Sequence, residues 1–320
     1  MRNAMMTHRD RAMTALSGKI PDHVPHFELV FHETERDFCG RTLIDQNCLP
    51  LAESGLDRQA AYEHNVELYL DIARKFEHDL IYVTPLEWPY WNHVDDVVEM
   101  LKRLREKSGN EFCLMAPGDP TFKIPGNPMG FAEKMYDAPQ KLHDEARRQF
   151  ELAAESYEKC FNAGADGIIM TSDYAMSSGP FLSPEAFAEF VAPYLKMAVH
   201  AAHGANLLVI KHSDGNLMPV IEQIVDSGID ALHSLDPMAG MDIKAVKEEY
   251  GSRICLCGNV HCAFMQTGTK EQIQASAEYC LTHGKPGGGY IFSTSNCVFR
   301  GMPLESYDLI HKIWMNKRDY

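Results

Sequence analysis

Short apolar runs alternate along the chain with longer segments whose apolar residues recur at the spacing of a helix. Runs rich in Val, Ile, Leu and Phe that end at turn residues are typical of strands buried on both faces. Such runs predict eight strands, at 26–31, 80–84, 112–116, 167–171, 207–211, 231–235, 254–257 and 290–293. Helical spacing predicts helices between most of them, at 65–75, 137–163, 184–203, 219–227, 242–250 and 270–283.

Alternating strands and helices predict an α/β fold in which helices cover a parallel sheet. Eight strands favour closure, so we predict one (β/α)8 barrel domain over residues 1–320. It would carry an N-terminal helical extension, and the irregular stretches 32–64 and 117–136 would form long loops over the C-terminal face. A doubly wound open sheet is the alternative, disfavoured because no Gly-x-Gly-x-x-Gly turn follows the first predicted strand.

Composition narrows the partners and the compartment. The formal net charge is -15, which would repel a phosphate backbone, so no nucleic-acid partner is expected. The N-terminus lacks the apolar core of a signal peptide, and no stretch approaches the roughly 18 apolar residues of a membrane span. We therefore expect a cytoplasmic protein without a membrane partner. The 9 scattered cysteines suit reduced thiols better than a disulfide framework.

Candidate functional side chains follow the predicted strands, where the active sites of this fold lie. Glu28 and His32 end the first predicted strand. The candidates after later strands are Trp88, Tyr90 and Trp91, then Asp173 and Tyr174, then His212 and Asp214, then Asp236, Cys257 and Cys297. The aromatic residues would either cap the barrel mouth or form a wall for an aromatic ligand. Glu28 would join them in binding the substrate.

Thiolates and an imidazole at neighbouring strand ends suit Zn²⁺, which prefers about four such ligands in a tetrahedron. The preferred set is His212, Cys257 and Cys297, with Asp214 or Asp236 as a possible fourth ligand. The simpler alternatives are buried apolar cysteines, a hydrogen-bonded histidine and aspartates that cap loops.

Motifs from Gly164 to about Tyr307 resemble the uroporphyrinogen decarboxylase superfamily. They are IKHSDGN at 210–216, DPMAGMDI at 236–243, CGNV at 257–260 and GGGYIFSTS at 287–295. The resemblance implies a (β/α)8 barrel, in agreement with the strand pattern. It also implies two alternative activities.

The decarboxylases of this superfamily bind a porphyrinogen with many carboxylates and need arginines near the N-terminus. Here residues 26–41 read HFELVFHETERDFCGR, without the arginine-rich pattern, and Glu28, Glu33 and Glu35 would repel that substrate. Decarboxylation is therefore the disfavoured alternative. A non-catalytic barrel of the same superfamily is a further one.

The other branch contains zinc-dependent methyltransferases that exchange a methyl group with a corrinoid protein. Their His-x-Cys motif is matched by His212, and their distal cysteine by Cys297. Asp214 replaces the first cysteine, and Cys257 would supply the missing thiolate. The resemblance implies O-demethylation of a small methylated donor, such as an aryl methyl ether. Zinc would activate the oxygen, Tyr174 or a protonated acid (Asp173 and Asp214 being candidates) would assist, and a separate protein would carry the corrinoid (cobalamin) with its Co(I) nucleophile.

Overall fold

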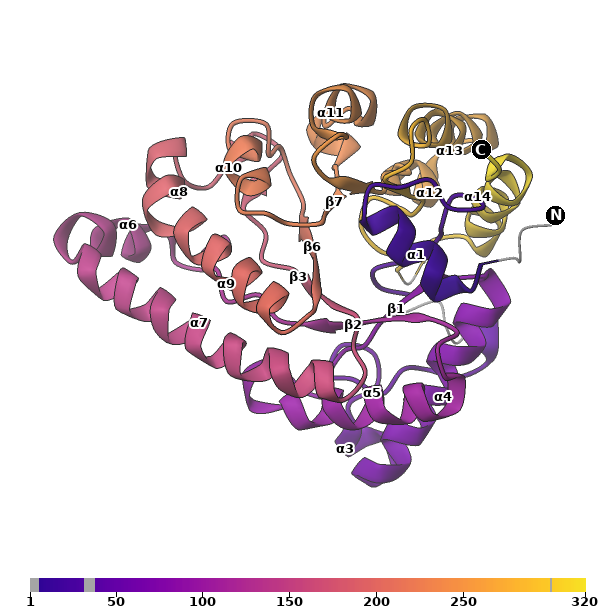
Figure 1. The fold of residues 1–320 in the computed structure, drawn as a ribbon, viewed down its shortest axis with the longest axis horizontal. Helices are drawn as coiled ribbons and strands as arrows, with labels where there is room; N and C mark the ends of the chain where they lie inside the picture. The colour runs from indigo at the N-terminus through magenta and orange to yellow at the C-terminus, as the bar shows by residue number, and fades with distance from the viewer. Residues whose placement is uncertain (1–5, 32–37, 300) are drawn as a thin grey trace.

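The computed structural model describes residues 6–31, 38–299 and 301–320, and it shows a curled parallel sheet surrounded by helices (Figure 1). Seven strands pair in the order β1-β2-β3-β6-β7-β8-β9, and every pair is parallel. Their bounds are β1 Leu80–Tyr82, β2 Cys113–Pro117, β3 Gly167–Met170, β6 Leu208–Ser213, β7 Ala231–Ser234, β8 Cys255–Cys257 and β9 Tyr290–Ile291. The predicted α/β barrel architecture is confirmed, and seven of the eight predicted strands are present.

The predicted first strand is reduced to a single bridge. Within 26–31, only His26 pairs, through a parallel bridge to Phe292. The Phe292 N–H donates to the Pro25 carbonyl at 2.8 Å, and the Asp79 N–H donates to the His26 carbonyl at 2.7 Å. The segment therefore joins the two edge strands, β9 and β1. It stays short because Pro25 has no N–H and the His26 N–H is taken by a side chain, the carboxylate of Asp79.

Most of the helices cover the outer face of the sheet. Their bounds are α1 His8–Leu16, α3 Leu51–Ser54, α4 Arg58–Phe76, α5 Val94–Ser108, α6 Pro128–Asp137, α7 Pro139–Asn162, α8 Pro184–Phe190, α9 Ala192–Gly204, α10 Ile221–Val225, α11 Ile243–Tyr250, α12 Cys262–Thr267, α13 Lys270–Gly284 and α14 Leu304–Lys317. The helix predicted at 184–203 is interrupted near Pro193, whose missing N–H lets a new helix begin there but not an old one continue. The stretch 117–136, predicted as a loop, contains most of α6. Within the described ranges, no helix is long and apolar enough to cross a membrane.

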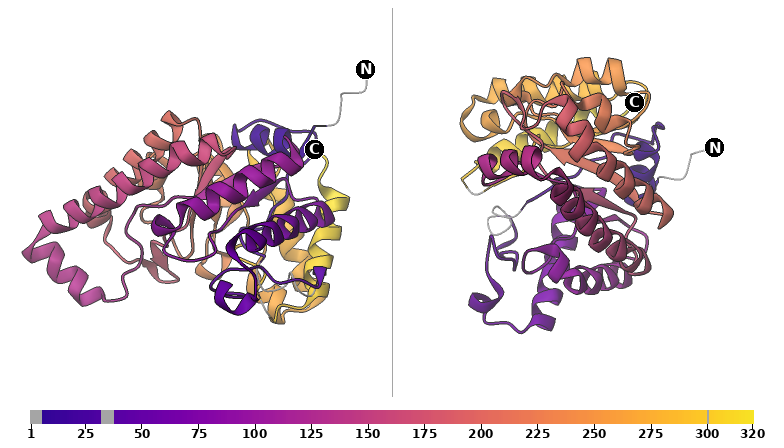
Figure 2. Two further views of the ribbon diagram at one scale, coloured as in Figure 1. Left: turned by 90° about the horizontal axis from the view of Figure 1, so that it is seen from below. Right: turned by 90° about the vertical axis from the view of Figure 1, so that its left-hand side faces the viewer.

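Two apolar clusters lie on opposite faces of the curled sheet. Because side chains alternate along a strand, Ile169 and Ile210 point inward, whereas Ile168 and Val209 pack under the helices. The first helix, α1, supplies Ala12 and Leu16 to the inner cluster. It contacts β1, β2 and β9, and the Arg9 N–H bonds to Glu111 just before β2, so α1 covers the N-terminal ends of the strands. The C-terminal ends are left to the candidate site. Figure 2 shows α6 and α7 projecting beyond the barrel.

One buried carboxylate ties α1 to the closure of the sheet. Asp79 is 0% exposed and accepts hydrogen bonds from the Arg11 guanidinium at 2.6 Å and from the His26 N–H at 2.8 Å. The Arg11 side chain is itself 3% exposed and also pairs with Asp22. A charge buried in this way depends on its partner, because solvent cannot replace it.

The variant Asp79→Asn keeps the shape of the side chain but removes its charge. We expect it to lower the free energy of unfolding by about 3 kcal/mol, because the Arg11 charge then stays buried with only Asp22 beside it. Urea denaturation at pH 7 measures this. The control, Glu111→Gln, breaks the surface pair with Arg74 and should cost below about 1 kcal/mol. Equal losses in both variants would contradict the proposed role of Asp79.

Candidate functional site

An imidazole and two carboxylates meet at the C-terminal ends of β3 and β6. The possible ligand atoms of Asp173, His212 and Asp214 all lie within 4.8 Å of one another. The His212 Nε2 is 3.7 Å from Asp173 Oδ1 and 3.8 Å from Asp214 Oδ1. His212 continues the inward positions of β6 after Ile210, so it rises from the barrel interior towards the mouth. Its side chain is 7% exposed, whereas those of Asp173 and Asp214 are 42% and 30% exposed. The cluster therefore opens to solvent through its carboxylates.

A second histidine fixes the orientation of His212. The Nδ1 atoms of His212 and His233 are 2.7 Å apart, and the His233 Nε2 is 3.2 Å from the Ser293 hydroxyl. Burial lowers the pKa of both imidazoles. The pKa of His233 lies well below its ordinary value, because the neighbouring His212 lowers it further. Both rings are therefore neutral at pH 7. When His233 donates to Ser293, its Nδ1 accepts from His212, which leaves a lone pair on the His212 Nε2 facing the carboxylates.

The backbone and its neighbours also hold Asp214 in place. Its carboxylate accepts from the Ser234 hydroxyl at 2.7 Å and from the Asn296 amide, and its N–H donates to Asp173. Ser234 has φ of 86°, a left-handed conformation that is costly for a residue with a side chain and that clusters at functional sites. Burial raises the pKa of Asp214, and the nearby His212 only partly offsets this effect.

Gly215 allows the loop after β6 to pass close to a neighbouring hairpin. Its φ is 85°, and a Cβ atom there would lie 2.4 Å from the Ala175 carbonyl oxygen. Ala175 begins the two-stranded hairpin formed by β4 (Ala175–Met176) and β5 (Gly179–Pro180). This glycine therefore lets the hairpin that follows β3 lie against the loop that carries Asp214.

The geometry of this cluster fits a divalent metal ion. Two ligands in a tetrahedron with bonds of about 2.0–2.1 Å lie roughly 3.3 Å apart, close to the observed 3.7 and 3.8 Å. Histidine and aspartate are both zinc ligands, and a metal-binding histidine typically donates its other N–H to a neighbour, the role that His212 takes towards His233 when His233 donates to Ser293. Asp173, His212 and Asp214 could thus hold zinc with small side-chain movements.

The structure does not bring the predicted thiols and Asp236 into this group within the described ranges. Cys257 is fully buried in the inner apolar cluster, where burial and the neighbouring Cys255 raise its pKa well above the ordinary value. Cys297 is half-buried beyond β9, and its carbonyl faces the Cys262 thiol at 3.9 Å. The two oxygens of Asp236 accept backbone N–H groups of Gly215 and Met238, as expected of a loop cap. Ligation by these residues stays a prediction.

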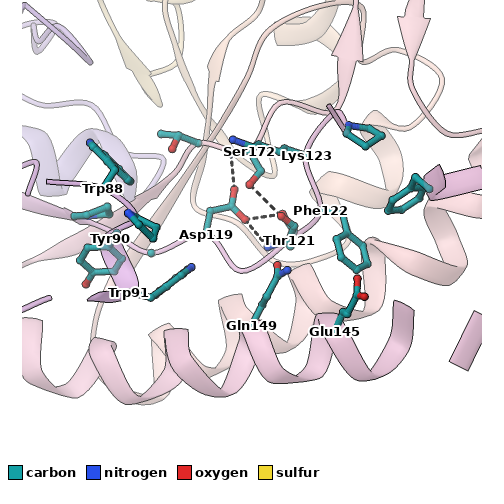
Figure 3. Close-up of a pocket in the computed structure, with 16 residues that line it drawn as sticks. Trp88, Tyr90, Trp91, Asp119, Thr121, Phe122, Lys123, Glu145, Gln149 and Ser172 are labelled. Carbon is teal, nitrogen blue, oxygen red and sulfur yellow. Dashed lines mark hydrogen bonds between the residues drawn. The ribbon is translucent and has the colours of Figure 1, made fainter. Parts of the chain in front are cut away.

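A cavity of about 520 Å³ lies at the ends of β2 and β3 (Figure 3), and its lining includes Ser172, the residue before Asp173. The three predicted aromatic residues line one side of it, and α7 forms its floor. Its lining is Trp88, Pro89, Tyr90, Trp91, Pro117, Gly118, Asp119, Thr121, Phe122, Lys123, Pro125, Phe131, Glu145, Gln149, Thr171 and Ser172. The sequence leaves two interpretations of these aromatic residues, a cap over the barrel mouth or a wall for an aromatic ligand. They border a cavity of the size that binds small ligands, which is compatible with the second interpretation.

A buried ion pair joins the lining of this cavity to β6, the strand that carries His212. The Lys211 ammonium donates to Asp119 and to the Ser172 carbonyl, both at 2.7 Å, and Lys211 is 0% exposed. Burial, the largest single effect, would raise the pKa of Asp119, but the charge of Lys211 together with the hydrogen bonds from Lys211, Thr121 and Ser172 lowers it. Burial lowers the pKa of Lys211, against the opposing effect of Asp119. The residues that follow Ser172 and Lys211 are Asp173 and His212, so the pair aligns two members of the cluster.

Tyr174 belongs to this buried support. Its hydroxyl lies 2.6 Å from the Thr121 hydroxyl, and its ring lies 4.0 Å from the Lys211 ammonium. Burial raises its pKa well above the ordinary value. The structure therefore directs the hydroxyl towards Thr121, and the predicted role of Tyr174 as an acid stays a prediction.

Glu28 lies apart from the 520 Å³ cavity, beside another of about 40 Å³. Its carboxyl accepts from the N–H and hydroxyl groups of Thr294. Burial raises its pKa to about 8, although the Thr294 hydrogen bonds oppose the shift. Its predicted role in substrate binding stays a prediction. His32, Glu33 and Glu35 lie outside the described residues.

Three residues of this region were not singled out from the sequence. Lys211 interrupts an apolar run in a buried strand, which signals a buried ion pair. His233 stands at an inward position of β7, one residue before the strand ends at Ser234. Asp119 resembled an ordinary turn residue in Pro-Gly-Asp-Pro, so the sequence carried no signal for its partner 92 positions away.

Comparisons with known proteins give one family. The profile described as "Uroporphyrinogen decarboxylase (URO-D)" matches residues 85–313, more than half of the chain. A uroporphyrinogen decarboxylase of Chlorobium luteolum is 31% identical over 155 residues, which cover 47% of this chain and 41% of that protein. One from Coxiella burnetii is 24% identical over 182 residues, covering 54% and 46%. The chain thus spans less than half of the length of these relatives.

Solved structures share the fold at lower identity. A methyltransferase from Methanosarcina mazei aligns with a TM-score of 0.74 and 19% identity, covering 97% of this chain and 99% of that one. A B12-independent methionine synthase from Shewanella sp. W3-18-1 aligns with a TM-score of 0.51 and 12% identity, covering 82% and 90%. These matches show a common architecture.

Glu28 should make stability depend on pH. Its folded pKa is about 8 against an ordinary 4.5, so between these values the folded state holds a proton that the unfolded state has lost. The free energy of unfolding should therefore fall as pH rises from about 4.5 to 8, by roughly 1.4 kcal/mol per pH unit from this group. Glu28→Gln removes this contribution, so urea denaturation should show the variant gaining on the wild type across that range. The exposed control Glu305→Gln should follow the wild type at every pH; a parallel Glu28→Gln profile would refute the assignment.

Proposed function

Because the chain belongs to the uroporphyrinogen decarboxylase family, we propose that it uses the family's barrel for methyl transfer from a small methylated donor to a corrinoid carried by a separate protein. The resemblance predicted from the motifs is confirmed at the level of the family. The finer proposal rests on one observation, the metal-competent cluster of Asp173, His212 and Asp214 at the open end of the barrel. The fold shared with the Methanosarcina mazei methyltransferase is compatible with it.

The neighbouring cavity disfavours a porphyrinogen with many carboxylates. Recognition of such a substrate calls for several cations, ideally arginines that bind carboxylates through two hydrogen bonds. Within the described part of the chain, the cavity lining holds one cation, Lys123, beside the carboxylates of Asp119 and Glu145. The aromatic side chains are better suited to an uncrowded planar donor such as an aryl methyl ether.

The proposed reaction divides between the cluster and the cavity. The aromatic wall would hold the ring of the donor so that its methoxy oxygen lies at the barrel mouth. A zinc ion held by His212, Asp173 and Asp214 would supply a Lewis acid that stabilises negative charge on that oxygen. The methyl–oxygen bond would break with its electron pair left on the oxygen, which would take a proton from water, and the reduced corrinoid of the partner protein would accept the methyl group. His233 would keep the His212 Nε2 directed at the position that the zinc ion shares with the two carboxylates.

Metal content tests which residues form the centre. Wild-type protein loaded with zinc and dialysed should retain about one ion per chain. His212→Ala should lose it, while His200→Ala, which alters an exposed histidine of α9, should retain it. Retention in Cys257→Ser and Cys297→Ser would assign the site to the three grouped residues. Loss in either cysteine variant would show instead that thiolates complete it, and a zinc-free wild type would refute the site.

Activity tests the reaction itself. Mixed with a reduced corrinoid protein and a methoxylated aromatic compound, the zinc-loaded chain should convert the corrinoid spectrum to that of the methylated form. His212→Ala should lower this rate by roughly 10²–10³-fold, as expected when a group that stabilises developing charge is lost. His233→Ala should lower it about 10–100-fold, because His233 acts through His212. Decarboxylation of a porphyrinogen without spectral change of the corrinoid would favour the alternative activity.

A further inference from the structure

Of the charged groups that line the 520 Å³ cavity, some have an oppositely charged partner among the described residues and one does not. The Asp119 carboxylate is paired with Lys211 at 2.7 Å, and it also accepts from the Thr121 hydroxyl and the Ser172 N–H. Its four hydrogen bonds, including that from the Thr121 N–H at 2.9 Å, leave it no capacity for a ligand.

The other charged groups of the lining lie towards the outside. Glu145 is paired with Lys134 at 2.8 Å. Lys123 is exposed and has no anionic partner within the described ranges. Both acids of the lining are thus neutralised by neighbours, and one cation is not. A ligand with a single negative charge would complete the balance.

The uncharged polar groups of the cavity are mainly donors. The indole N–H groups of Trp88 and Trp91 and the side-chain amide of Gln149 make no hydrogen bond to the described residues. Figure 3 shows the Trp91 ring and the Gln149 amide directed at the space in front of Asp119. Donors that lack protein partners favour a ligand that brings acceptor oxygens.

The remaining walls are flat and apolar. Trp88, Trp91, Phe122, Phe131 and Pro125 surround the cavity, and the volume of about 520 Å³ lies within the usual range for a small organic ligand. Aromatic side chains and proline rings pack best against a planar ring.

We propose that this cavity binds an aromatic monocarboxylate, with the ring between Trp88, Trp91 and Phe122 and the carboxylate towards Lys123 and the free N–H groups. The inference rests on the proposed function in that it names the class of methyl donor, a methoxylated benzoate. It assigns specificity to Lys123, Trp91 and Gln149. A neutral aryl ether would leave the ammonium and the amide donors unmatched.

Binding to the purified chain tests the assignment without a corrinoid protein or added metal. Isothermal titration compares 3,4-dimethoxybenzoate, neutral 1,2-dimethoxybenzene and cationic benzyltrimethylammonium. The benzoate should bind at least about tenfold more tightly than the neutral ether, since a charge-assisted contact and N–H hydrogen bonds are added. The cation should bind most weakly. A neutral ether or a cation that binds as tightly as the benzoate would overturn the proposal, as would the absence of binding by all three.

Variants separate the contribution of charge from that of shape. Lys123→Met should weaken benzoate binding about fivefold and change binding of the neutral ether less than twofold. The matched control, Lys312→Met, removes an exposed lysine of α14, away from the cavity, and should change neither. Trp91→Phe keeps an apolar ring but removes the N–H, so it should weaken the benzoate more than the ether. Equal weakening of both ligands by Lys123→Met would refute the charge argument, and thermal melting checks that each variant is folded.

The same ligands distinguish a failure of this inference from a failure of the proposed function. If the chain demethylates the neutral ether as well as the benzoate, methyl transfer stands and the assigned ligand class falls. If it binds the benzoate selectively and transfers no methyl group, the cavity is assigned correctly and the reaction is not methyl transfer.

Discussion

Closure of the sheet depends on the carboxylate of Asp79, which accepts a backbone hydrogen bond that a full strand would otherwise satisfy. A parallel barrel must satisfy the backbone of both edge strands, and here the joining segment contributes only one bridge, at His26. Asp79 accepts the His26 N–H with its side chain, donates its own N–H to the His26 carbonyl, and binds Arg11 of α1. Asp79 thus links the segment between the two edge strands to α1, the helix that covers the N-terminal end of the barrel. The opposite end is free to carry the site.

Strand alternation divides the chemistry of the open end into two environments. His212 and Lys211 are adjacent in sequence but face opposite sides of β6, so one reaches the barrel mouth and the other the outer layer beside the aromatic cavity. An imidazole can stay neutral in the first environment, whereas an ammonium in the second requires the Asp119 carboxylate. A shift of register by one residue would exchange them and destroy both sites.

The fold and part of the site could be predicted from the sequence because they depend on local patterns. Apolar runs identified seven strands, and the position of His212 after one of them placed it at the mouth. The sequence predicts a full strand at 26–31, where the structure has one bridge. The apolar character of this segment reflects burial against neighbours and not strand pairing. The sequence groups the cysteines with His212 because strand ends converge on average, and their ligation stays a prediction. In the structure, Cys257 belongs to the buried apolar cluster inside the barrel, an environment in which thiols typically pack as small hydrophobic groups. Lys211 in a buried strand signals an ion pair, but nothing local identifies its partner Asp119, which is 92 positions away.

The buried pair also connects the cavity lining to the cluster. Asp119 accepts the Ser172 N–H and the Lys211 ammonium, and the next residues along the chain are Asp173 and His212. The loop after β2 is therefore fixed to β3 and β6 at the positions from which two cluster residues project. Because the same loop carries Thr121, Phe122 and the cavity wall, a ring held in the cavity is held in register with the cluster. Rigid positioning of this kind is what a transfer reaction requires, since small misplacements of the reacting atoms lower its rate steeply.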